Sequence, residues 1–504
     1  MLINNFKNRF IFSVIGNVLK AFFVFGTGIF LAKHLGPSNY GNFTFLIGSF
    51  LAIKPIFDLG TSSAFFTFIS HKKRGHLFYE IYIKWLVFQF CIVFLPILFI
   101  SKNMISYIWV GSEKFHVLLA FIYVFLQQQI WQSLIQIGES YRKTFLIQFA
   151  NFLLAFFIFF GIFLLYSINL LSIDTVFFLT MLLYLIAILL AYFFIQKVDN
   201  KDKNVNESSN QIFAEYIKFC KPLALLSFFS FVYDFSDRWL LQKYGGSIQQ
   251  GYFQISNQFA SISLIITASV LNIFWKEISN SFNENDFHRV KDLFLRVSRI
   301  LYTSASVICG IFLPWSDFLI SSTLGVDYKD SWVIFMILLL FPLHQSIGQL
   351  IGVMYFSLKE TYKYSLISSI IMILTLPITY MVISTNGLNL GAFGLAIKTL
   401  VVSIISVNIH SWVISRICKF KIDWFFQFIC IFCTLPIAFF TKFIFSHFVL
   451  TLLNQFIFSS MLYLFLVSVF ILRFPYLIGC NRQQVSNFLR MLQVFYFKII
   501  KYGK

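Results

Sequence analysis

Two stretches of this chain decide how it folds, LAKHLGPSNYGNFTFLIGSF (31–50) and LLQKYGGSIQQGYFQISNQF (240–259). With one residue inserted, three pairs correspond: Gly36 and Gly245, Gly41 and Gly251, and Phe43 and Phe253. A tight turn favours glycine, and a second glycine lets the next helix start close by. Each stretch covers the first hairpin of a run of six apolar segments, which predicts an internal duplication. The alternative is chance similarity between two apolar, glycine-punctuated stretches.

The composition places this chain in a membrane. Of its 504 residues, 59% are hydrophobic and 12% are charged, and the mean hydropathy is +0.80. Soluble domains carry about 25% charged residues, so about half of the usual charge is missing. Apolar stretches of about 20 residues, long enough to cross a bilayer as helices, recur from end to end. The net charge is +19, but the basic residues do not form a soluble basic module, which argues against nucleic-acid binding.

The apolar stretches also predict a topology. Windows of spanning length predict fourteen transmembrane helices: 10–32, 42–67, 78–101, 115–137, 145–166, 174–196, 215–242, 250–275, 293–320, 331–356, 363–385, 390–415, 424–446 and 450–472. Cytoplasmic connectors collect Lys and Arg. With the amino terminus inside, roughly four times as many of these residues fall on the cytoplasmic side as outside. We therefore predict a multi-pass membrane protein with both termini in the cytoplasm.

The predicted fold is all-α, and one polar stretch divides it. KVDNKDKNVNESSNQ (197–211) separates the first six predicted helices from the next six, which suggests two lobes. The predicted parts are an N-lobe (1–200, helices 1–6), a cytoplasmic linker (201–212), a C-lobe (213–420, helices 7–12), helices 13 and 14 (421–472) and a basic cytoplasmic tail (473–504). We expect the tail to form an amphipathic helix on anionic lipid.

Three motifs carry a resemblance to a known family. LAKHLGPSNYGNFTF (31–45), FDLGTSSAFFTFIS (57–70) and SDRWLLQKYGGSIQQGYF (236–253) resemble the Wzx-type polysaccharide-biosynthesis flippases. These flippases belong to the multidrug/oligosaccharidyl-lipid/polysaccharide exporter superfamily. The resemblance implies two pseudo-symmetric, MATE-like six-helix bundles that face each other across a central cavity, with two helices appended.

The same resemblance implies a function. The expected substrate is undecaprenyl pyrophosphate carrying an oligosaccharide repeat unit. It would be moved from the cytoplasmic to the outer leaflet of the bacterial inner membrane, for the O-antigen of lipopolysaccharide or for capsule. The expected partners are this substrate, the membrane, a glycan polymerase and a chain-length regulator. No cofactor or resident metal is expected.

Charged residues within membrane spans are costly, so each is a functional candidate. Lys20 lies near the middle of the first predicted helix without an acidic residue nearby, which favours a water-filled cavity. Lys54 lies in the middle of the second predicted helix, and Asp58 follows one turn later on the same face. These two either neutralise each other as a structural pair or face the cavity.

Further charges fall in the seventh and twelfth predicted helices. Asp234 and Arg238 are spaced i,i+4, with Asp237 beside them. An interfacial salt bridge explains this pair as well as substrate or ion handling does. Lys398 lies deeper in its helix than snorkelling favours. Cations in a partly dehydrated cavity offset the cost of taking a pyrophosphate out of water. The predicted substrate cations are Lys20, Lys54, Arg238 and Lys398.

Amide side chains supply neutral hydrogen-bonding groups that suit sugars. Gln128, Gln132 and Gln136 share one face of the fourth predicted helix, and His344 and Gln345 lie together in the tenth. We predict that these residues bind substrate. The alternative is that the amides hold neighbouring helices together by hydrogen bonds.

The predicted mechanism is alternating access, in which two lobes rock around the site. An inward gradient of Na⁺ or H⁺ would drive it, with Asp58 or Asp234 as the coupling carboxylate.

A cation-coupled multidrug exporter of the same superfamily is the nearest alternative. Two extra helices and the intramembrane lysines favour the flippase instead. A membrane-embedded glycan polymerase is less favoured, because the longest outer connector (102–114) is short and no nucleotide-binding loop or paired-carboxylate motif occurs. We therefore expect a transporter rather than an enzyme.

Overall fold

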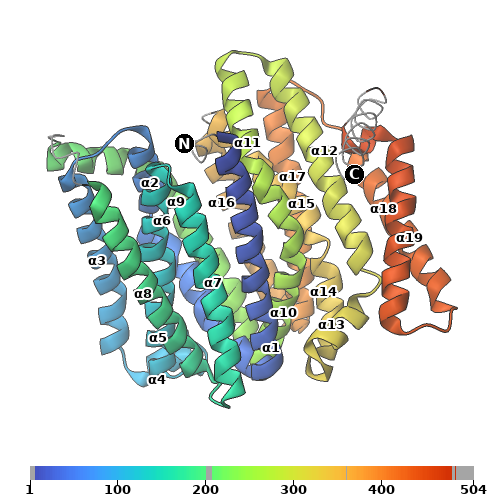
Figure 1. Cartoon of the computed structure of the whole chain (residues 1–504), viewed down its shortest axis with the longest axis horizontal. Helices are drawn as coiled ribbons and strands as arrows, with labels where there is room; N and C mark the ends of the chain where they lie inside the picture. The colour runs from blue at the N-terminus through green and yellow to red at the C-terminus, as the bar shows by residue number, and fades with distance from the viewer. Residues whose placement is uncertain (1–5, 200–206, 359, 480–482, 484–504) are drawn as a thin grey trace, which may run out of the picture. The chain divides into compact units, whose positions relative to one another are not determined.

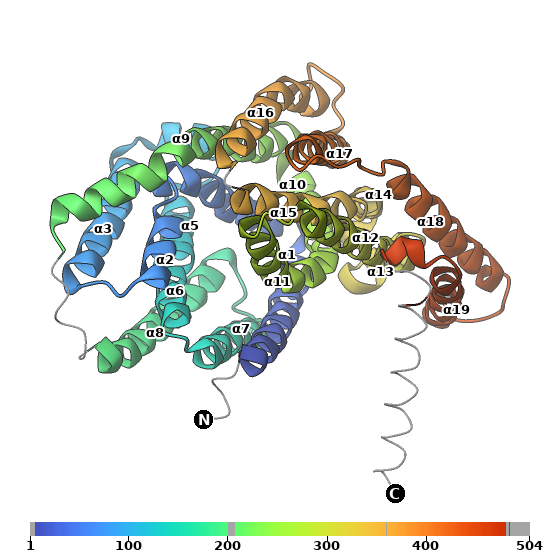
Figure 2. The same cartoon turned by 90° about the horizontal axis from the view of Figure 1, so that it is seen from above.

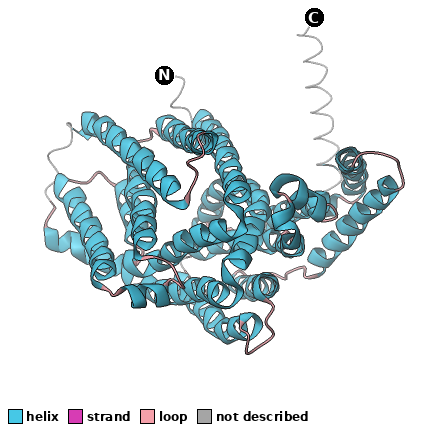
Figure 3. Ribbon diagram, turned by 90° about the horizontal axis from the view of Figure 1, so that it is seen from below, coloured by secondary structure: helices cyan, strands magenta, loops and turns pink. Residues whose placement is uncertain are grey.

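The computed structural model describes residues 6–199, 207–358, 360–479 and 483, and within them every regular element is helical (Figure 3). The first part of the chain forms α1 (Phe6–Asp58), α2 (Thr61–His71), α3 (His76–Phe99), α4 (Lys102–Ile108), α5 (Lys114–Phe125), η2 (Leu126–Trp131), α6 (Gln132–Ser140), α7 (Thr144–Ser167) and α8 (Ile173–Asp199) (Figure 1). The second part forms α9 (Ser209–Leu240), η3 (Leu241–Gly245), α10 (Gly246–Ala260), η4 (Ser261–Ser263), α11 (Leu264–Asn283), α12 (Phe287–Phe312), α13 (Ser316–Leu324), η5 (Val326–Ser331), α14 (Trp332–Leu338), α15 (Phe341–Ser357), α16 (Thr361–Ile383), α17 (Gly391–Ile417), α18 (Phe425–Ser446), α19 (Leu452–Arg473) and η6 (Pro475–Ile478). The predicted all-α class is confirmed.

The helices are those of a multi-pass membrane protein. In the described part of the chain, 10 helices are long and apolar enough to cross a membrane, or 11 if the bent pair Val326–Leu338 and Phe341–Ser357 is one span. The first candidate, Ile15–Asp58, has 44 residues. At 1.5 Å per residue it is about twice as long as a bilayer core is thick. The number of crossings therefore depends on how such long elements are divided, and fourteen stays a prediction.

The second predicted helix, 42–67, is wrong as a single element. The chain leaves the helix after Asp58, where Leu59 has φ 46° and Gly60 has φ 81°. Helix α2 then begins at Thr61. The Asp58 carboxylate accepts a hydrogen bond from the Ser62 backbone N–H at 3.1 Å and so satisfies one free donor of the first turn of α2.

The described chain separates into two compact units. The first comprises residues 1–258, 323–331 and 365–398, and the second comprises 259–322, 332–364 and 399–504. The predicted division into lobes at the linker stays a prediction. Most of the predicted tail (473–504) and the first half of the predicted linker (201–212) lie outside the described residues.

Aromatic packing holds the first unit together around α1, which lies against α7 and α9. The Phe23 ring in α1 has its centroid 5.3 Å from that of Phe156 and 5.7 Å from that of Phe159, both in α7, in edge-to-face arrangements. Such arrangements are the favoured geometry for aromatic pairs. α9 runs along the unit in contact with α1, α2 and α3 (Figure 2).

An ionic cluster fixes the beginning of α9. Arg74, whose side chain is 3% exposed, donates to the carboxylates of Glu207 at 2.9 Å and Glu215 at 2.7 Å. Lys72 adds a contact to Glu207 at 3.1 Å. Ser208 then caps the helix through a capping box with Gln211. The α2–α3 connection therefore holds the start of α9.

In the second unit, α12 packs against α11, α15 and α18, and α18 packs against α19. Arg299 of α12 is 3.0 Å from the Asp423 carboxylate, which precedes α18, and stacks on the Tyr476 ring of η6 at 3.9 Å. The Thr303 hydroxyl donates to the Leu477 carbonyl at 2.6 Å. These contacts attach both ends of the α18–α19 hairpin to one helix.

The two glycine-punctuated stretches form equivalent turns in the first unit. Gly36 has φ 73° and ψ 166°, and Gly246 has φ 75° and ψ 177°. Gly36 therefore corresponds to Gly246 rather than to Gly245, and the inserted residue in the predicted alignment is wrong. The reason is that η3, a π-helical turn, extends through Gly245, so the residue with positive φ is the second glycine of the pair.

The equivalent turns also meet each other reciprocally. A side-chain carbon at Gly41 would overlap the Ser247 carbonyl, and one at Gly251 would overlap the Pro37 carbonyl. In the corrected alignment Gly41 corresponds to Gly251 and Pro37 to Ser247, so each contact is the counterpart of the other. Chance similarity does not explain this exchange, which supports a duplication within the first unit.

Candidate functional site

Lys398 and Asp237 form a buried ion pair in the first unit. The Lys398 ammonium lies 2.8 Å and 2.6 Å from the two Asp237 carboxylate oxygens, and the Thr379 hydroxyl donates to the same carboxylate at 3.0 Å. The Lys398 side chain is 1% exposed and its Nζ lies 3.9 Å from the Tyr233 ring centroid. The charge of Lys398 is thus already compensated. Its predicted role in substrate binding stays a prediction and requires this pair to open.

Arg238 lies against a helix that leaves room for it. A side-chain carbon at Gly48 of α1 would overlap Arg238 Nη1. The equivalent contact of the other half joins Gly28 and Gln258, and there the Gln258 amide occupies the space beside the glycine. In the corrected alignment Gly28 corresponds to Arg238 and Gly48 to Gln258. The duplication therefore places a cation at a position where the other half has glycine.

Arg238 and Asp234 do not pair within the described chain. No ion pair at 4.0 Å or less joins them, although their spacing is i,i+4, and Asp234 is exposed. The acidic neighbour at Asp237 is already bound to Lys398. The interfacial salt bridge, one of the two explanations for this pair, is thus not formed as a direct contact, although the charges of Asp234 and Arg238 act on each other. The guanidinium lies over Gly48 instead.

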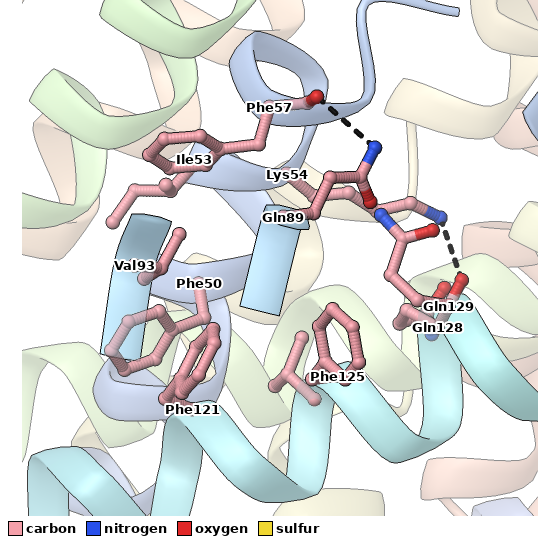
Figure 4. Close-up of a pocket in the computed structure, with 11 residues that line it drawn as sticks. Phe50, Ile53, Lys54, Phe57, Gln89, Val93, Phe121, Phe125, Gln128 and Gln129 are labelled. Atoms are coloured by element: carbon pink, nitrogen blue, oxygen red, sulfur yellow. Dashed lines mark hydrogen bonds between the residues drawn. The ribbon is translucent and has the colours of Figure 1, made fainter. Parts of the chain in front are cut away.

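Lys54 reaches a backbone carbonyl across the first unit. Its Nζ donates to the Gln128 carbonyl at 3.1 Å (Figure 4). Gln128 lies in η2, a π-helical turn between α5 and α6. π-helical turns within α-helices occur frequently at functional sites. Lys54 also lines a small pocket bounded by α1, α3, α5 and η2.

Asp58 is bound by hydroxyl groups rather than by Lys54. The Asp58 carboxylate accepts from the Thr61 hydroxyl at 3.0 Å and from the Ser62 hydroxyl at 2.6 Å. Ser62 also donates to the Gln129 amide oxygen at 3.3 Å. Both Lys54 and Asp58 belong to the described chain, yet no ion pair joins them. The two residues form no direct ion pair, but the Asp58 charge acts on Lys54, so the alternative of a neutralising pair stays open.

The predicted face of amides in the fourth helix is interrupted. Because η2 is wound as a π-helix, residues four apart do not stack as they do in an α-helix. Gln128 lines the pocket, Gln132 is exposed, and the Gln136 amide oxygen is buried without a partner in the described residues. Their roles in binding stay predictions.

The remaining candidates do not belong to this group. Lys20 in α1 is partly buried and has no hydrogen-bond or ion-pair partner among the described residues. His344 and Gln345 lie in α15 of the second unit. His344 is 6% exposed, its Nδ1 has no partner in the described chain, and its ring lies edge-on to that of Tyr302 at 5.6 Å.

Three residues of these contacts were not among the predicted site residues. The acidic partner of Lys398, Asp237, was visible in the sequence beside Asp234, but nothing indicated which carboxylate would be paired. Gln89 and Gln129 contact the candidate site from α3 and η2. A polar residue in an apolar segment was their only signal. Within the described residues no cluster of three or more His, Cys, Asp or Glu side chains could hold a metal ion.

No model of a known protein family matches this chain, and no curated protein sequence matches it. Solved structures do. The lipid II flippase MurJ in an inward closed conformation matches with a TM-score of 0.68 at 17% identity, over 92% of this chain and 98% of that chain. An inward-facing multidrug resistance MATE family transporter of the MOP superfamily matches with a TM-score of 0.57 at 14% identity, over 82% of this chain and 100% of the other. A MOP superfamily transporter from Pyrococcus furiosus, described by the reverse polarity of its binding pocket, matches with a TM-score of 0.55 at 15% identity, over 82% and 95%. The chain therefore has the fold that these transporters share.

Proposed function

We propose that this protein is a flippase that moves an anionic, lipid-linked oligosaccharide across the membrane. The observation that carries the proposal is a set of cations that lack an ion-pair partner among the described residues. Lys20, Lys54 and Arg238 lie in helices of the first unit and form no ion pair with any described carboxylate. A charge held within a membrane without a direct ion-pair partner is costly, so an anionic ligand would stabilise these residues. The pyrophosphate of a lipid-linked sugar is such a ligand.

The proposed substrate is undecaprenyl pyrophosphate carrying an oligosaccharide repeat unit, for O-antigen or capsule. The proposed location is the bacterial inner membrane, with both termini in the cytoplasm. The motif resemblance and the fold shared with a lipid II flippase support this choice. The proposed mechanism is alternating access between two lobes. Asp58 and Asp234 remain the proposed carboxylates for coupling to Na⁺ or H⁺, and neither forms an ion pair in the described chain.

A flipping assay tests the proposal. The purified full chain is placed in liposomes that contain a fluorescent polyprenyl-pyrophosphate oligosaccharide, and the fraction accessible from the other leaflet is followed over time. We expect flipping to require the protein and to fall at least about tenfold in Lys20→Gln, the loss expected when one charged hydrogen bond to the substrate is removed. The matched control is Lys102→Gln, because Lys102 is exposed in α4. Equal accessibility with and without the protein would refute the flippase.

The exposed Asp234 favours one second candidate, a cation-coupled multidrug exporter. A carboxylate that is exposed and unpaired suits a cationic drug or a coupling ion. This candidate predicts that liposomes containing the chain take up a fluorescent cationic drug and that Asp234→Asn abolishes the uptake. Flipping of the lipid-linked sugar without drug uptake decides against it.

A further inference from the structure

The pocket at Lys54 has two ends of different chemistry (Figure 4). The rings of Phe50 and Phe121 lie at one end. At the other end, Lys54 and the amides of Gln89 and Gln129 lie together beside the η2 turn. An apolar wall with a few grouped polar atoms is typical of pockets that bind small molecules or parts of larger ones.

The polar end has hydrogen-bonding groups that the described chain does not use. The ammonium of Lys54 has three N–H donors, and one described acceptor, the Gln128 carbonyl, takes one of them. Gln89 is 3% exposed, and its amide nitrogen donates to the Phe57 carbonyl at 3.2 Å. Its amide oxygen is buried and accepts from no described residue. A buried acceptor without a donor is costly, so this oxygen indicates a missing group.

The charge of the missing group can be matched to the site. Lys54 is the one cation that lines the pocket. A single ammonium among apolar side chains compensates one negative charge, whereas a pyrophosphate diester carries about two. A carboxylate carries one. The Asp58 charge acts on Lys54, but no ion pair at 4.0 Å or less joins these two described residues, and the Asp58 carboxylate accepts from Thr61 and Ser62. The remaining Lys54 donors are therefore left for a ligand.

We propose that this pocket binds the carboxylate of an acidic sugar, a hexuronate, within the translocated oligosaccharide. The carboxylate accepts from Lys54, and a neighbouring sugar hydroxyl donates to the free oxygen of Gln89. The apolar face of the sugar ring packs toward Phe50 and Phe121. The inference rests on the proposed function and refines it, since it assigns Lys54 to the sugar and leaves Lys20 and Arg238 for the pyrophosphate.

The experiment compares two substrates that differ in one group. Both are fluorescent polyprenyl-pyrophosphate oligosaccharides, identical except that one carries glucuronate where the other carries glucose. Flipping of each is measured with the full chain in liposomes. Binding of the corresponding soluble oligosaccharides to the purified chain is measured separately by calorimetry. The variants are Lys54→Gln, which removes the charge, Lys54→Arg, which keeps it, and Gln89→Met, which removes the free acceptor at similar length. Lys102→Gln is the control.

We expect the wild-type chain to bind and flip the glucuronate substrate at least about tenfold better than the glucose substrate, because a hydrogen bond to a charged group is at stake. This preference should fall at least about tenfold in Lys54→Gln and recover in part in Lys54→Arg. It should also fall, by less, in Gln89→Met, a variant that keeps the proposal testable if Lys54→Gln does not fold. Lys102→Gln should keep the preference.

The two proposals fail in different ways. Equal binding and equal flipping of both substrates by the wild type would overturn the acidic-sugar pocket and leave the flippase standing. Lys54-dependent binding of the glucuronate oligosaccharide without flipping of either substrate would overturn the flippase and leave the pocket. A preference that survives Lys54→Gln unchanged would also overturn the pocket, because the charge would then come from elsewhere.

Discussion

Lys398 and Asp237 are 161 residues apart in sequence and form one buried pair in space. Of this contact, the sequence alone predicts the buried charge but not its partner. Charges in apolar segments can be found by inspection, and Lys398 was found in this way. Its partner could not be chosen among the acidic residues, because the choice depends on how α9, α16 and α17 pack.

The pair leads to a prediction about stability. Removing one member leaves the other as a buried, uncompensated charge, which costs about 3–5 kcal/mol in comparable cases. We expect Lys398→Met alone to lower the thermal unfolding midpoint strongly. The double variant Lys398→Met with Asp237→Leu should recover much of the loss, since no charge is then buried. Thermal unfolding of the purified protein in detergent measures both. A double variant less stable than Lys398→Met would contradict this account.

Gly48 leads to a prediction about Arg238. An alanine at Gly48 would displace the Arg238 guanidinium, since its side-chain carbon would overlap Nη1. We expect Gly48→Ala to reduce flipping nearly as much as Arg238→Gln, although Gly48 carries no charge. Gly352→Ala is the matched control, because nothing lies within 4 Å of the added carbon there. Normal flipping in Gly48→Ala would show that the position of the Arg238 guanidinium does not matter for moving the substrate.

At the scale of elements, the predicted apolar segments fall mainly on helices, although 42–67, 293–320 and 331–356 each cross a break between two helices. The reason is physical, because a stretch of about 20 apolar residues in a bilayer must satisfy its backbone internally as a helix. The details inside the segments were not predictable in the same way. Hydropathy does not register the π-helical η2 or the break at Leu59 and Gly60, because it measures how polar a stretch is and not how its backbone is wound. The roles predicted for the site residues remain predictions.

The equivalent turns at Gly36 and Gly246 predict matched effects. Both residues combine positive φ with ψ near 170°, a conformation that is essentially restricted to glycine and costs other residues about 1–3 kcal/mol. We expect Gly36→Ala and Gly246→Ala to lower the unfolding free energy by similar amounts. Asparagine should not rescue either position, since ψ near 170° lies outside the left-handed helical region that asparagine tolerates. Chemical denaturation of the solubilised protein gives the comparison. Strongly unequal losses would argue that the two turns are not equivalent.

The ionic cluster at the start of α9 predicts a dependence on pH. Burial raises the pKa of Glu207. The hydrogen bonds from Lys72 and Arg74 and the positive charges of these residues together lower it by more than burial raises it, so the pKa lies below the usual value of 4.5. A lowered carboxylate pKa adds stability that is complete above the unfolded value and is lost as the pH falls through the folded value.

We therefore expect the wild type to lose thermal stability on going from about pH 6 to about pH 3.5, and Arg74→Gln to lose less over the same interval. Arg289→Gln is the control, because Arg289 and Glu277 form a more exposed pair, of a kind that contributes little. An equal loss in the wild type and in Arg74→Gln would show that the cluster does not cause the pH dependence.

For the whole molecule, the fold is shared with proteins that are 14–17% identical to this chain. Sequence comparison alone finds no such relative. The composition and the repeated hairpin nevertheless indicated the fold, because membrane burial and glycine turns constrain residue type more than residue identity. The number of crossings stays a prediction, since α1 comprises two helices merged across a kink at Gly36 and is longer than one span.

The predicted orientation can be tested on intact cells. We expect Glu284→Cys, in the exposed connection between α11 and α12, to be protected from a membrane-impermeant maleimide. Leu170→Cys, in the exposed connection between α7 and α8, should be labelled. The background is a chain with its native cysteines replaced, and permeabilised cells give the full signal for both sites. Labelling of Glu284→Cys without permeabilisation would reverse the topology.

The reciprocal contact at Gly41 and Gly251 has a consequence for how this chain diverges over time. Its touching atoms are backbone carbonyls and amides, which every sequence possesses. The interface therefore requires that Gly41 and Gly251 stay small, and it does not depend on the side chains of their neighbours. Ancestral halves can drift apart in nearly every side chain and still meet at the same place. A substitution that adds bulk on either side, by contrast, is felt by both halves at once, so these two positions must be inherited together.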